Sequence, residues 1–216
     1  PGAAVLPWQQ DPLGIDAGAF HTDVLAVGND GFLMLHERAF VHGRDLVQEL
    51  RKRLGADLSV VVAEEPELPV KDAVGSYPFN SQIVTLPDGS MSIIAPLEAS
   101  ESATCRSFLE RVLAEDNPVR AVHYVDVNAS MNNGGVPACL RLRVALTDAE
   151  RATIGARVFL DDALDRDLTA WIERRYRDRV AAPDLADPQL LREVRTALDE
   201  LTTLLRLGFV YDFQRP

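Results

Sequence analysis

The hydrophobic and polar positions of this chain follow the same order twice, which predicts an internal structural repeat. Short apolar runs at residues 24–27 and 32–35 flank a turn signal at 29–31, and a helical pattern at 46–54 precedes an apolar run at 58–63. The same order returns at 83–86, 91–95, 105–113 and 121–127. Each unit is therefore predicted to be strand, turn, strand, helix and strand. Repeated units of this kind pack on one another in arrays or propellers.

The two ends of the chain have different patterns. Residues 1–19 contain three prolines and three glycines, which predicts an extended segment with little regular structure. Residues 147–150 have the sequence of a helix capping box, and Asp187 and Pro188 suit the start of a last helix. Between them, the spacing predicts a long amphipathic helical segment with these apolar residues on one face: Leu160, Leu164, Leu168, Trp171 and Ile172. We expect a single α/β portion over 1–216, with units at about 20–63 and 80–127 and a helical segment at 147–216.

Composition narrows the classes of partner. The chain has 216 residues, 47% of them hydrophobic, so it can bury a sizeable core. Its net charge of −11 argues against nucleic acid, whose phosphates select basic surfaces, and favours a small or cationic ligand. The sequence shows neither a long apolar run nor a secretory leader, and it has two cysteines. We therefore expect no membrane contact and a reducing, cytoplasmic location with both thiols free.

A glycine-rich segment leading into a cysteine is the first candidate for chemistry. Residues 132–139 read NNGGVPAC, and the alternating run at 140–146 predicts a strand over 138–146. On that strand Cys139 shares a face with Arg141 and Arg143, away from the leucines. Polar backbone and nearby cations can lower the pKa of a thiol, so Cys139 is the candidate nucleophile. The alternative is an ordinary buried cysteine at the start of a strand.

The second candidate is the pair His21 and Asp23. In an extended segment both side chains project to one side, so an imidazole and a carboxylate can serve one site. Proton transfer and cation binding would suit this pair. The alternative is a strand-end histidine beside a solvated aspartate. A metal site is a weaker interpretation, because no further histidines stand at ligand spacing.

The other reactive side chains are predicted to be structural. His36 and His42 are expected in surface or capping roles, and His123 is expected to be buried in mid-strand. Cys105 falls on the apolar face of a helix and is expected in the core. The arginines at positions 174, 175, 177 and 179 are expected to form a solvated helix face or a partner contact.

Long motifs give the chain a specific resemblance. FHTD at 20–23, SMNNGGVPACLRLRV at 130–144 and ADPQLLRE at 186–193 resemble N-succinylarginine dihydrolase, and QQDP at 9–12 and YPFNSQ at 77–82 extend the match. This family belongs to the guanidine-modifying penteins. The resemblance implies a partial pentein-type propeller of strand-strand-helix-strand units with a helical C-terminal end, covering the C-terminal half of the family's chain. It also implies an amidinotransferase-like fold, a cytoplasmic homodimer and a reaction without metal or cofactor.

The resemblance also implies residue roles. Cys139 would attack the guanidinium carbon of N-succinylarginine, and His21 would be the general acid and base. Asp23 would hold guanidinium nitrogens, and Asn133 would contact the substrate. The products would be N-succinylornithine, two ammonia and carbon dioxide, as a step of arginine catabolism. Val136 stands where relatives carry a further glycine in some cases.

The family's chain is about twice as long, and its N-terminal half carries the catalytic acidic residue. We therefore expect these 216 residues alone to be inactive. Two alternatives stay open: another guanidine hydrolase, such as an arginine or agmatine deiminase, and a non-catalytic half-propeller that binds a partner through exposed sheet edges.

Overall fold

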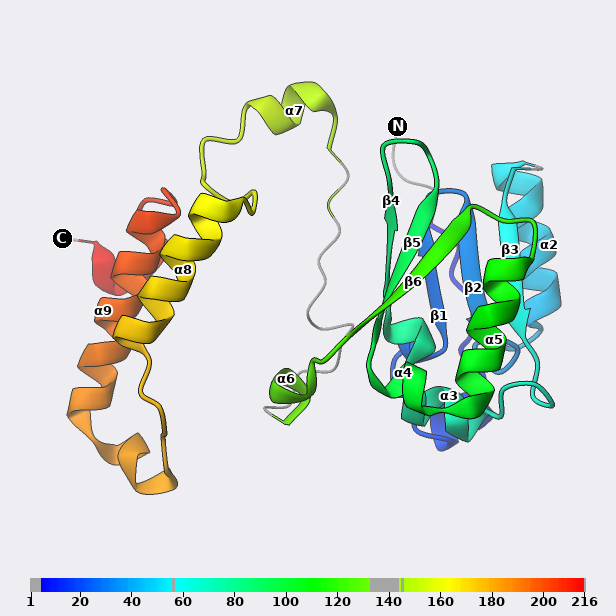
Figure 1. The fold of residues 1–216 in the computed structure, drawn as a ribbon, viewed down its shortest axis with the longest axis horizontal. Coiled ribbons are helices and arrows are strands. Elements are labelled where there is room, and N and C mark those ends of the chain that lie inside the picture. Colours follow the sequence, from blue (N-terminus) through cyan, green and yellow to red (C-terminus); the bar gives the residue numbers. More distant parts are fainter. Residues whose placement is uncertain (1–4, 56, 133–143, 145, 216) are drawn as a thin grey trace. The chain divides into compact units, whose positions relative to one another are not determined.

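The chain forms two compact units, Pro1–Arg143 and Val144–Pro216. The computed structural model describes residues 5–55, 57–132, 144 and 146–215. Figure 1 shows strands and helices in the first unit and helices in the second.

Two small mixed sheets of identical topology build the first unit. In the first sheet β1 (Ala26–Asn29) pairs antiparallel with β2 (Phe32–His36), which pairs parallel with β3 (Ser59–Ala63). In the second, β4 (Gln82–Thr85) pairs antiparallel with β5 (Met91–Pro96), which pairs parallel with β6 (Val119–Val125). The helices α2 (Gly43–Leu54) and α5 (Ala103–Ala114) make the parallel connections. The predicted repeat is confirmed, strand by strand.

Local sequence explains where the two connecting helices begin and end. Gly55 ends α2 with a φ of 92°, a backbone conformation that glycine adopts without steric cost. Ser102 begins α5, because its side chain accepts a hydrogen bond from the amide of Cys105. The buried face of α5 carries Cys105, Phe108, Leu109 and Val112. These side chains are the apolar positions whose spacing predicted the helix.

The two sheets share one hydrophobic core. Their first strands lie next to each other, and Asn29 on β1 donates a side-chain hydrogen bond of 2.8 Å to Thr85 at the end of β4. The core combines Met34 and Val61 of the first sheet with Ile93 of the second and Phe108 of α5. Because one continuous core joins both repeats, neither repeat buries its apolar surface alone.

The connections hold more regular structure than their composition predicts. The lead-in contains α1 (Pro12–Asp16), so the expectation of an irregular segment at 1–19 is wrong there; Asp11 caps this helix through its side chain. The link between the repeats contains α3 (Val70–Ser76) and the short 3₁₀ helix η2 (Pro78–Asn80). Two further short helices are α4 (Glu98–Glu101) and α6 (Asn128–Asn132).

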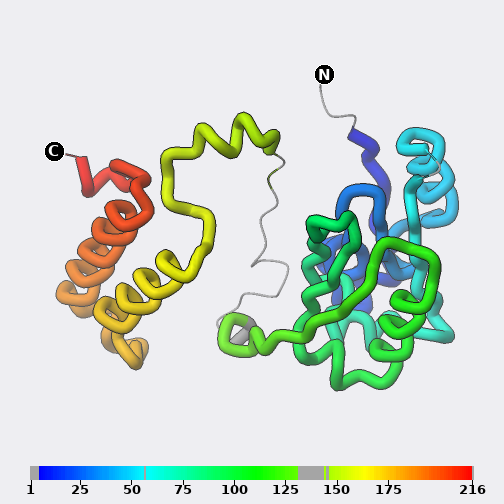
Figure 2. Tube along the Cα trace, turned by 45° about the horizontal axis from the view of Figure 1, so that its top comes forward, coloured from blue at the N-terminus to red at the C-terminus, as the bar shows by residue number. Residues whose placement is uncertain are grey.

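The second unit consists of helices. They are α7 (Asp148–Ala152), α8 (Asp162–Arg175), the 3₁₀ helix η4 (Ala182–Ala186), α9 (Pro188–Leu204) and the 3₁₀ helix η5 (Asp212–Gln214). Figures 1 and 2 show α8 and α9 side by side. The indole N–H of Trp171 donates to the carbonyl of Ala197 at 3.1 Å between them. The capping box at 147–150 and the Asp187 cap are confirmed.

The predicted apolar face at 160–172 is only partly right. Leu164 and Trp171 are buried, but Ile172 is 47% exposed and Leu160, at 71%, precedes the helix. The buried positions of α8 therefore extend over two turns, from Leu164 to Trp171, which is a shorter stretch than the five apolar positions suggested.

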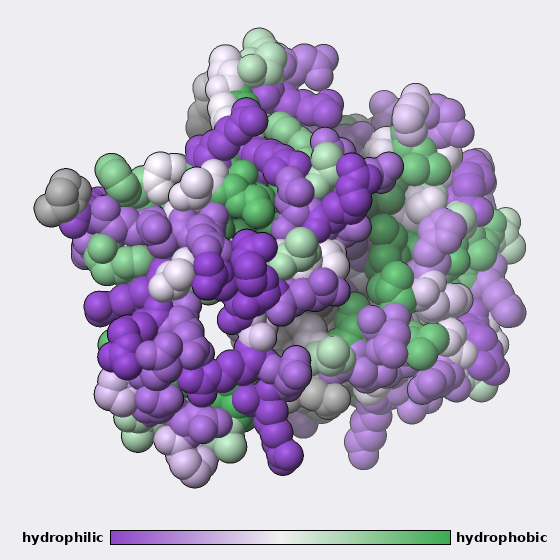
Figure 3. All heavy atoms as spheres, turned by 60° about the vertical axis from the view of Figure 1, so that its left-hand side comes forward, coloured by the Kyte–Doolittle hydropathy of each residue, from purple (hydrophilic) through white to green (hydrophobic). Residues whose placement is uncertain are grey.

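Hydrophilic side chains cover most of the face drawn in Figure 3, and hydrophobic side chains gather there in separate patches. Among the described residues, no helix is both long enough and apolar enough to cross a membrane.

Candidate functional site

His21 and Asp23 lie on a tight turn that leads into β1. Thr22–Val24 form a 3₁₀ helix, η1, and His21 is its N-cap residue with extended backbone angles. The extended segment predicted for residues 20–23 is therefore wrong beyond His21, because the chain closes a helical turn before the strand begins. The two residues remain on one turn, but strand alternation is not what places them together.

The turn is exposed at its tip and buried at both ends. His21 and Thr22 are exposed, and Phe20 is 64% exposed with its ring centroid 4.9 Å from that of His21. Ala19 before the turn and Leu25 after it are fully buried. This arrangement presents an imidazole at the surface of the unit while the flanking backbone is fixed in the core.

Two side-chain amides contact the backbone of this turn. Asn80 in η2 donates from Nδ2 to the carbonyl of Asp23 at 2.9 Å. Gln10 donates from Nε2 to the carbonyl of Ala19 at 2.5 Å. Sequence reasoning assigned no role to either residue, although both lie in motifs that carried the resemblance, QQDP and YPFNSQ.

The predicted nucleophile lies outside the described residues. Asn133, Cys139 and most of the strand expected at 138–146 fall there. The described residues Val144 and Leu146 are not in a strand and are 61% and 46% exposed. The α6 helix, Asn128–Asn132, ends one residue before Asn133 and two before Gly134 in the sequence. The roles of Cys139 and Asn133 therefore stay predictions.

The remaining histidines divide differently from the sequence prediction. His36 is fully buried, so the surface alternative predicted for it is wrong, and its contacts fit the capping alternative. Its Nε2 bonds the carbonyl of Leu68 at 2.8 Å, and its Nδ1 accepts from the amide of Arg38 at 3.0 Å. Burial lowers the pKa of this ring, which keeps it neutral. His123 is exposed on β6, so its predicted burial is wrong; His42 is exposed at the start of α2, as expected.

Cys105 is a core residue, as predicted. Its side chain is fully buried on α5, and burial raises the pKa of the thiol to about 11. Since the thiolate is the reactive form, Cys105 is a poor nucleophile.

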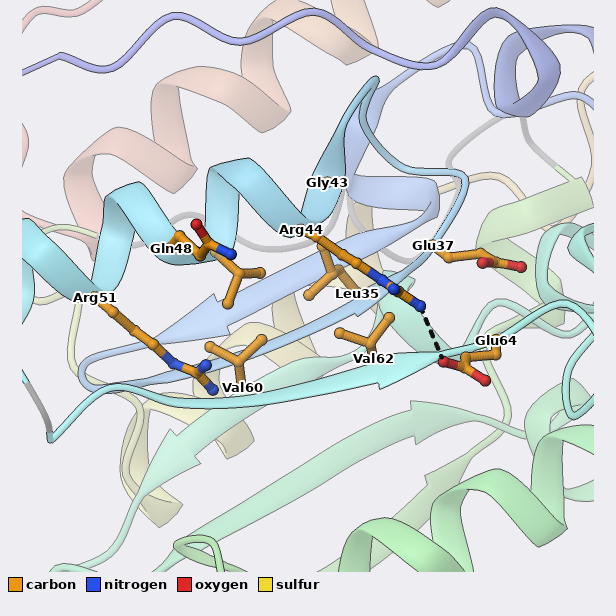
Figure 4. Close-up of a pocket in the computed structure, with 10 residues that line it drawn as sticks. Leu35, Glu37, Gly43, Arg44, Gln48, Arg51, Val60, Val62 and Glu64 are labelled. Carbon is orange, nitrogen blue, oxygen red and sulfur yellow. Dashed lines mark ion pairs between the residues drawn. The ribbon is translucent and has the colours of Figure 1, made fainter.

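Two cavities of the first unit have linings of described residues that do not include His21. The close-up in Figure 4 shows one of about 370 Å³ between α2 and the strands β2 and β3, with Val60 and Val62 in its floor. Arg44 reaches from α2 toward Glu64 across its mouth, 4.0 Å away. A second cavity, of about 410 Å³, has a mostly aliphatic and aromatic lining and touches the turn at Thr22. Neither contains a cysteine or a histidine in its lining.

Three arginines of the predicted basic cluster, Arg174, Arg175 and Arg177, are paired with acids. Arg175 forms a salt bridge with Glu200, and Arg177 bonds Glu193 at 2.7 Å. These bonds tie α8 and the segment after it to α9, so part of the predicted basic cluster holds the helices together. Within the part of the chain that the structure describes, no group of three histidine, cysteine, aspartate or glutamate side chains could hold a metal ion.

Comparison with known proteins gives one consistent result. A family model described as succinylarginine dihydrolase matches residues 2–214. An N-succinylarginine dihydrolase of Myxococcus xanthus is 63% identical over 212 residues, which are 98% of this chain and 48% of that protein. Proteins of the same name from Burkholderia multivorans and Shewanella amazonensis are 52% and 48% identical over 96% of this chain and 47% of theirs. The chain thus spans about half the length of the curated relatives it matches.

Proposed function

This chain belongs to the succinylarginine dihydrolase family, and from that premise we propose that it carries one side of the active site of an enzyme that hydrolyses the guanidinium group of N-succinylarginine. The products would be N-succinylornithine, two ammonia and carbon dioxide, with two waters consumed. The observation that supports this most strongly is the 63% identity to the Myxococcus xanthus enzyme across nearly the whole chain.

In the proposed mechanism Cys139 supplies the nucleophile. Its thiolate attacks the guanidinium carbon, and the tetrahedral intermediate collapses with loss of ammonia to leave an amidino thioether on sulfur. His21 donates the proton that ammonia takes with it and then removes a proton from the water that attacks the thioether carbon. Asp23 holds guanidinium nitrogens through its carboxylate, and Asn133 contacts the substrate. Attack of this water expels the thiolate. A second round of attack and hydrolysis in the same site releases the second ammonia, and the carbamate left on the ornithine nitrogen loses carbon dioxide to give N-succinylornithine.

The turn that carries His21 suits this role physically. A proton carrier must reach both the departing nitrogen and the incoming water, so its side chain has to be accessible. His21 is exposed at the tip of a turn whose ends are buried, and Asp23 lies two residues away on the same turn. The structure supports the placement of this pair; the partner thiol at Cys139 is proposed from the motif.

We also propose that the two repeats are blades of a pentein propeller. The two sheets share strand order, strand direction and a helical crossover, and they lie next to each other through β1 and β4. A closed ring needs further blades, and the relatives are about twice as long as this chain. We therefore expect the 216 residues alone to lack activity, because the family's catalytic acidic residue belongs to the part that the match does not cover.

Ammonia stoichiometry tests the proposal. The native gene product that contains these residues is incubated with a limiting amount of N-succinylarginine, and ammonia and N-succinylornithine are measured at completion. Two ammonia per substrate are expected. One ammonia, with a citrulline-type product, would instead indicate a deiminase, and no ammonia from the native protein would favour a non-catalytic module. The expected homodimer stays a prediction, which sedimentation of the native protein tests.

A further inference from the structure

We propose that Asn80 and Gln10 are positioning residues that fix the turn bearing His21 and Asp23 from its two sides. This inference rests on the proposed function, because it concerns the geometry of the residues that would transfer protons and bind the guanidinium group. Neither amide needs to touch the substrate to act in this way.

The two hydrogen bonds bracket His21 symmetrically. Gln10 donates to the carbonyl of Ala19, two residues before His21, and Asn80 donates to the carbonyl of Asp23, two residues after it. Gly18, with a φ of 111°, precedes the bracketed segment. Side chains 9 and 57 positions away in the sequence thus hold the backbone at Ala19 and at Asp23.

Asn80 is held rigidly by its neighbours in the core. It is 1% exposed, and Phe79 beside it is fully buried. The Phe79 ring lies edge-on to His36 at a centroid distance of 6.4 Å and packs on Phe108 at 5.7 Å. Because these aromatic contacts hold η2 in the core, the position of the donating Asn80 amide is fixed relative to the core, and its hydrogen bond fixes the carbonyl of Asp23 in turn.

Gln10 is anchored through its backbone. It forms an isolated antiparallel bridge with Phe40, and the flanking amides of Asp11 and Val41 bond the carbonyls of Ala39 and Gln9 at 3.2 and 3.0 Å. The connection from β2 to α2 therefore holds the segment around Gln10 in place, and this segment in turn holds the Gln10 side chain against Ala19.

The need for this bracket follows from the exposure of His21. An exposed imidazole has few packing contacts to fix it, so its position depends on the backbone that carries it. A displacement of about 1 Å in a catalytic group can cost roughly 100-fold in rate. Loosening either end of the turn should therefore reduce turnover more than it reduces substrate affinity.

Asn117 provides a matched control. Like Asn80 it is a buried asparagine, 6% exposed, and its Nδ2 donates to a carbonyl, that of Val112, at 2.6 Å. It lies before the start of β6, whereas Asn80 lies before the start of β4. Because β4 runs antiparallel to β5 and β5 parallel to β6, the two asparagines stand at opposite ends of the sheet.

The experiment compares Asn80→Asp, Gln10→Glu and Asn117→Asp in the native gene product. Each substitution keeps the shape of the side chain and removes the donating amide. Steady-state kinetics with N-succinylarginine give kcat and KM, and urea unfolding gives the stability of each variant. A second readout needs no activity: the ring signals of ¹³C-labelled histidine, with His21 assigned by a His21→Gln variant.

We expect Asn80→Asp and Gln10→Glu to lower kcat by about 10- to 100-fold with less than about a threefold change in KM, and to shift the His21 signal. Asn117→Asp should lose comparable stability, keep kcat within about threefold and leave the His21 signal in place. The fold-loss of kcat in the double variant, Asn80→Asp with Gln10→Glu, should be smaller than the product of the two single fold-losses, because both hydrogen bonds act on one turn.

Equal kcat losses in Asn80→Asp and Asn117→Asp, or an unmoved His21 signal in both bracket variants, would overturn the inference. If Asn80→Asp does not fold, Gln10→Glu decides by the same criteria. A native protein that releases no ammonia would refute the proposed function instead, and the His21 signal would still report whether the amides fix the turn.

Discussion

Replacing Phe79 with alanine should destabilise the first unit by about 3–5 kcal/mol. The Phe79 side chain is fully buried, with a relative exposure of 0%, and its ring contacts both His36 and Phe108. Loss of the buried ring removes its transfer free energy and leaves a cavity that the surrounding core fills only in part. Each aromatic pair adds about 0.5–1.5 kcal/mol, which places the expected loss in the upper part of the range.

Cys105 is a reporter for this unit, because it lies in the same core cluster and is fully buried. The protein is equilibrated in a urea series at one fixed pH and given a short pulse of maleimide. Peptide masses then give the labelled fraction of Cys105 separately from Cys139. The shift in the urea midpoint, multiplied by the slope of the transition, gives the change in the free energy of unfolding.

Phe209→Ala is the control, since that phenylalanine is 67% exposed and belongs to the second unit. It should change the Cys105 midpoint by no more than about 0.5 kcal/mol. A loss below about 1 kcal/mol for Phe79→Ala, or equal losses for both variants, would refute the assignment of Phe79 to the centre of the core.

Two further predictions concern charge. The hydrogen bonds of His36 need a neutral ring, and burial lowers the pKa of this ring, so its contribution to stability is complete above the ordinary histidine pKa and is lost as pH falls through the folded-state pKa. Below about pH 6.5 the free energy of unfolding should therefore decrease by at most about 1.4 kcal/mol per pH unit. Urea unfolding at a series of pH values should show a flatter pH profile for His36→Gln but not for His123→Gln. Arg111 forms a bidentate salt bridge with Glu67, at 2.6 and 2.7 Å, and also donates to the carbonyl of Val62 at 2.9 Å. This pair is partly exposed, and Arg111→Met should lower the free energy of unfolding by about 1–3 kcal/mol, part of which Arg111→Lys, which keeps the charge, should restore. A loss below about 0.5 kcal/mol for Arg111→Met would contradict a stabilising role of these hydrogen bonds.

The repeated strands and helices could be predicted because their signals are local. Gly31 and Gly89 mark turns between strands, and the spacing of Leu46, Val47 and Leu50 marks a helix. Strands β1 to β6 appear where alternating or continuous apolar runs predicted them, with ends that differ by at most two residues. Pattern reasoning fails where short polar segments fold through contacts distant in sequence, as in α3 and η2, whose positions depend on the shared core.

The histidines show why burial is harder to predict than secondary structure. His36 ends a strand, as a surface residue often does, but the loop carrying Leu68 folds over it and accepts its hydrogen bond. His123 occupies mid-strand but lies on β6, which has a single partner, β5, among the described strands. Which strand is at an edge follows from sheet order, and one sequence carries no direct signal for it.

The sequence predicted the residues of the candidate site but not the side chains that hydrogen-bond to their backbone. His21 and Asp23 followed from a short motif, although the local conformation is a 3₁₀ turn. The amides of Gln10 and Asn80 act on carbonyls, which every residue possesses, so no side-chain pattern pairs them with Ala19 and Asp23. Only the folded chain brings these amides within hydrogen-bond distance of the two carbonyls.

We propose that Cys139 is the nucleophile of a guanidine hydrolase and that His21 is its proton carrier. The most direct test is to quench the native gene product during turnover of N-succinylarginine with acid and to map the masses of its cysteine peptides. We expect the Cys139 peptide to gain the mass of the substrate less one ammonia, and Cys139→Ser to abolish both the adduct and ammonia release. Ammonia release that persists in Cys139→Ser, or an adduct on Cys105 instead, would contradict it.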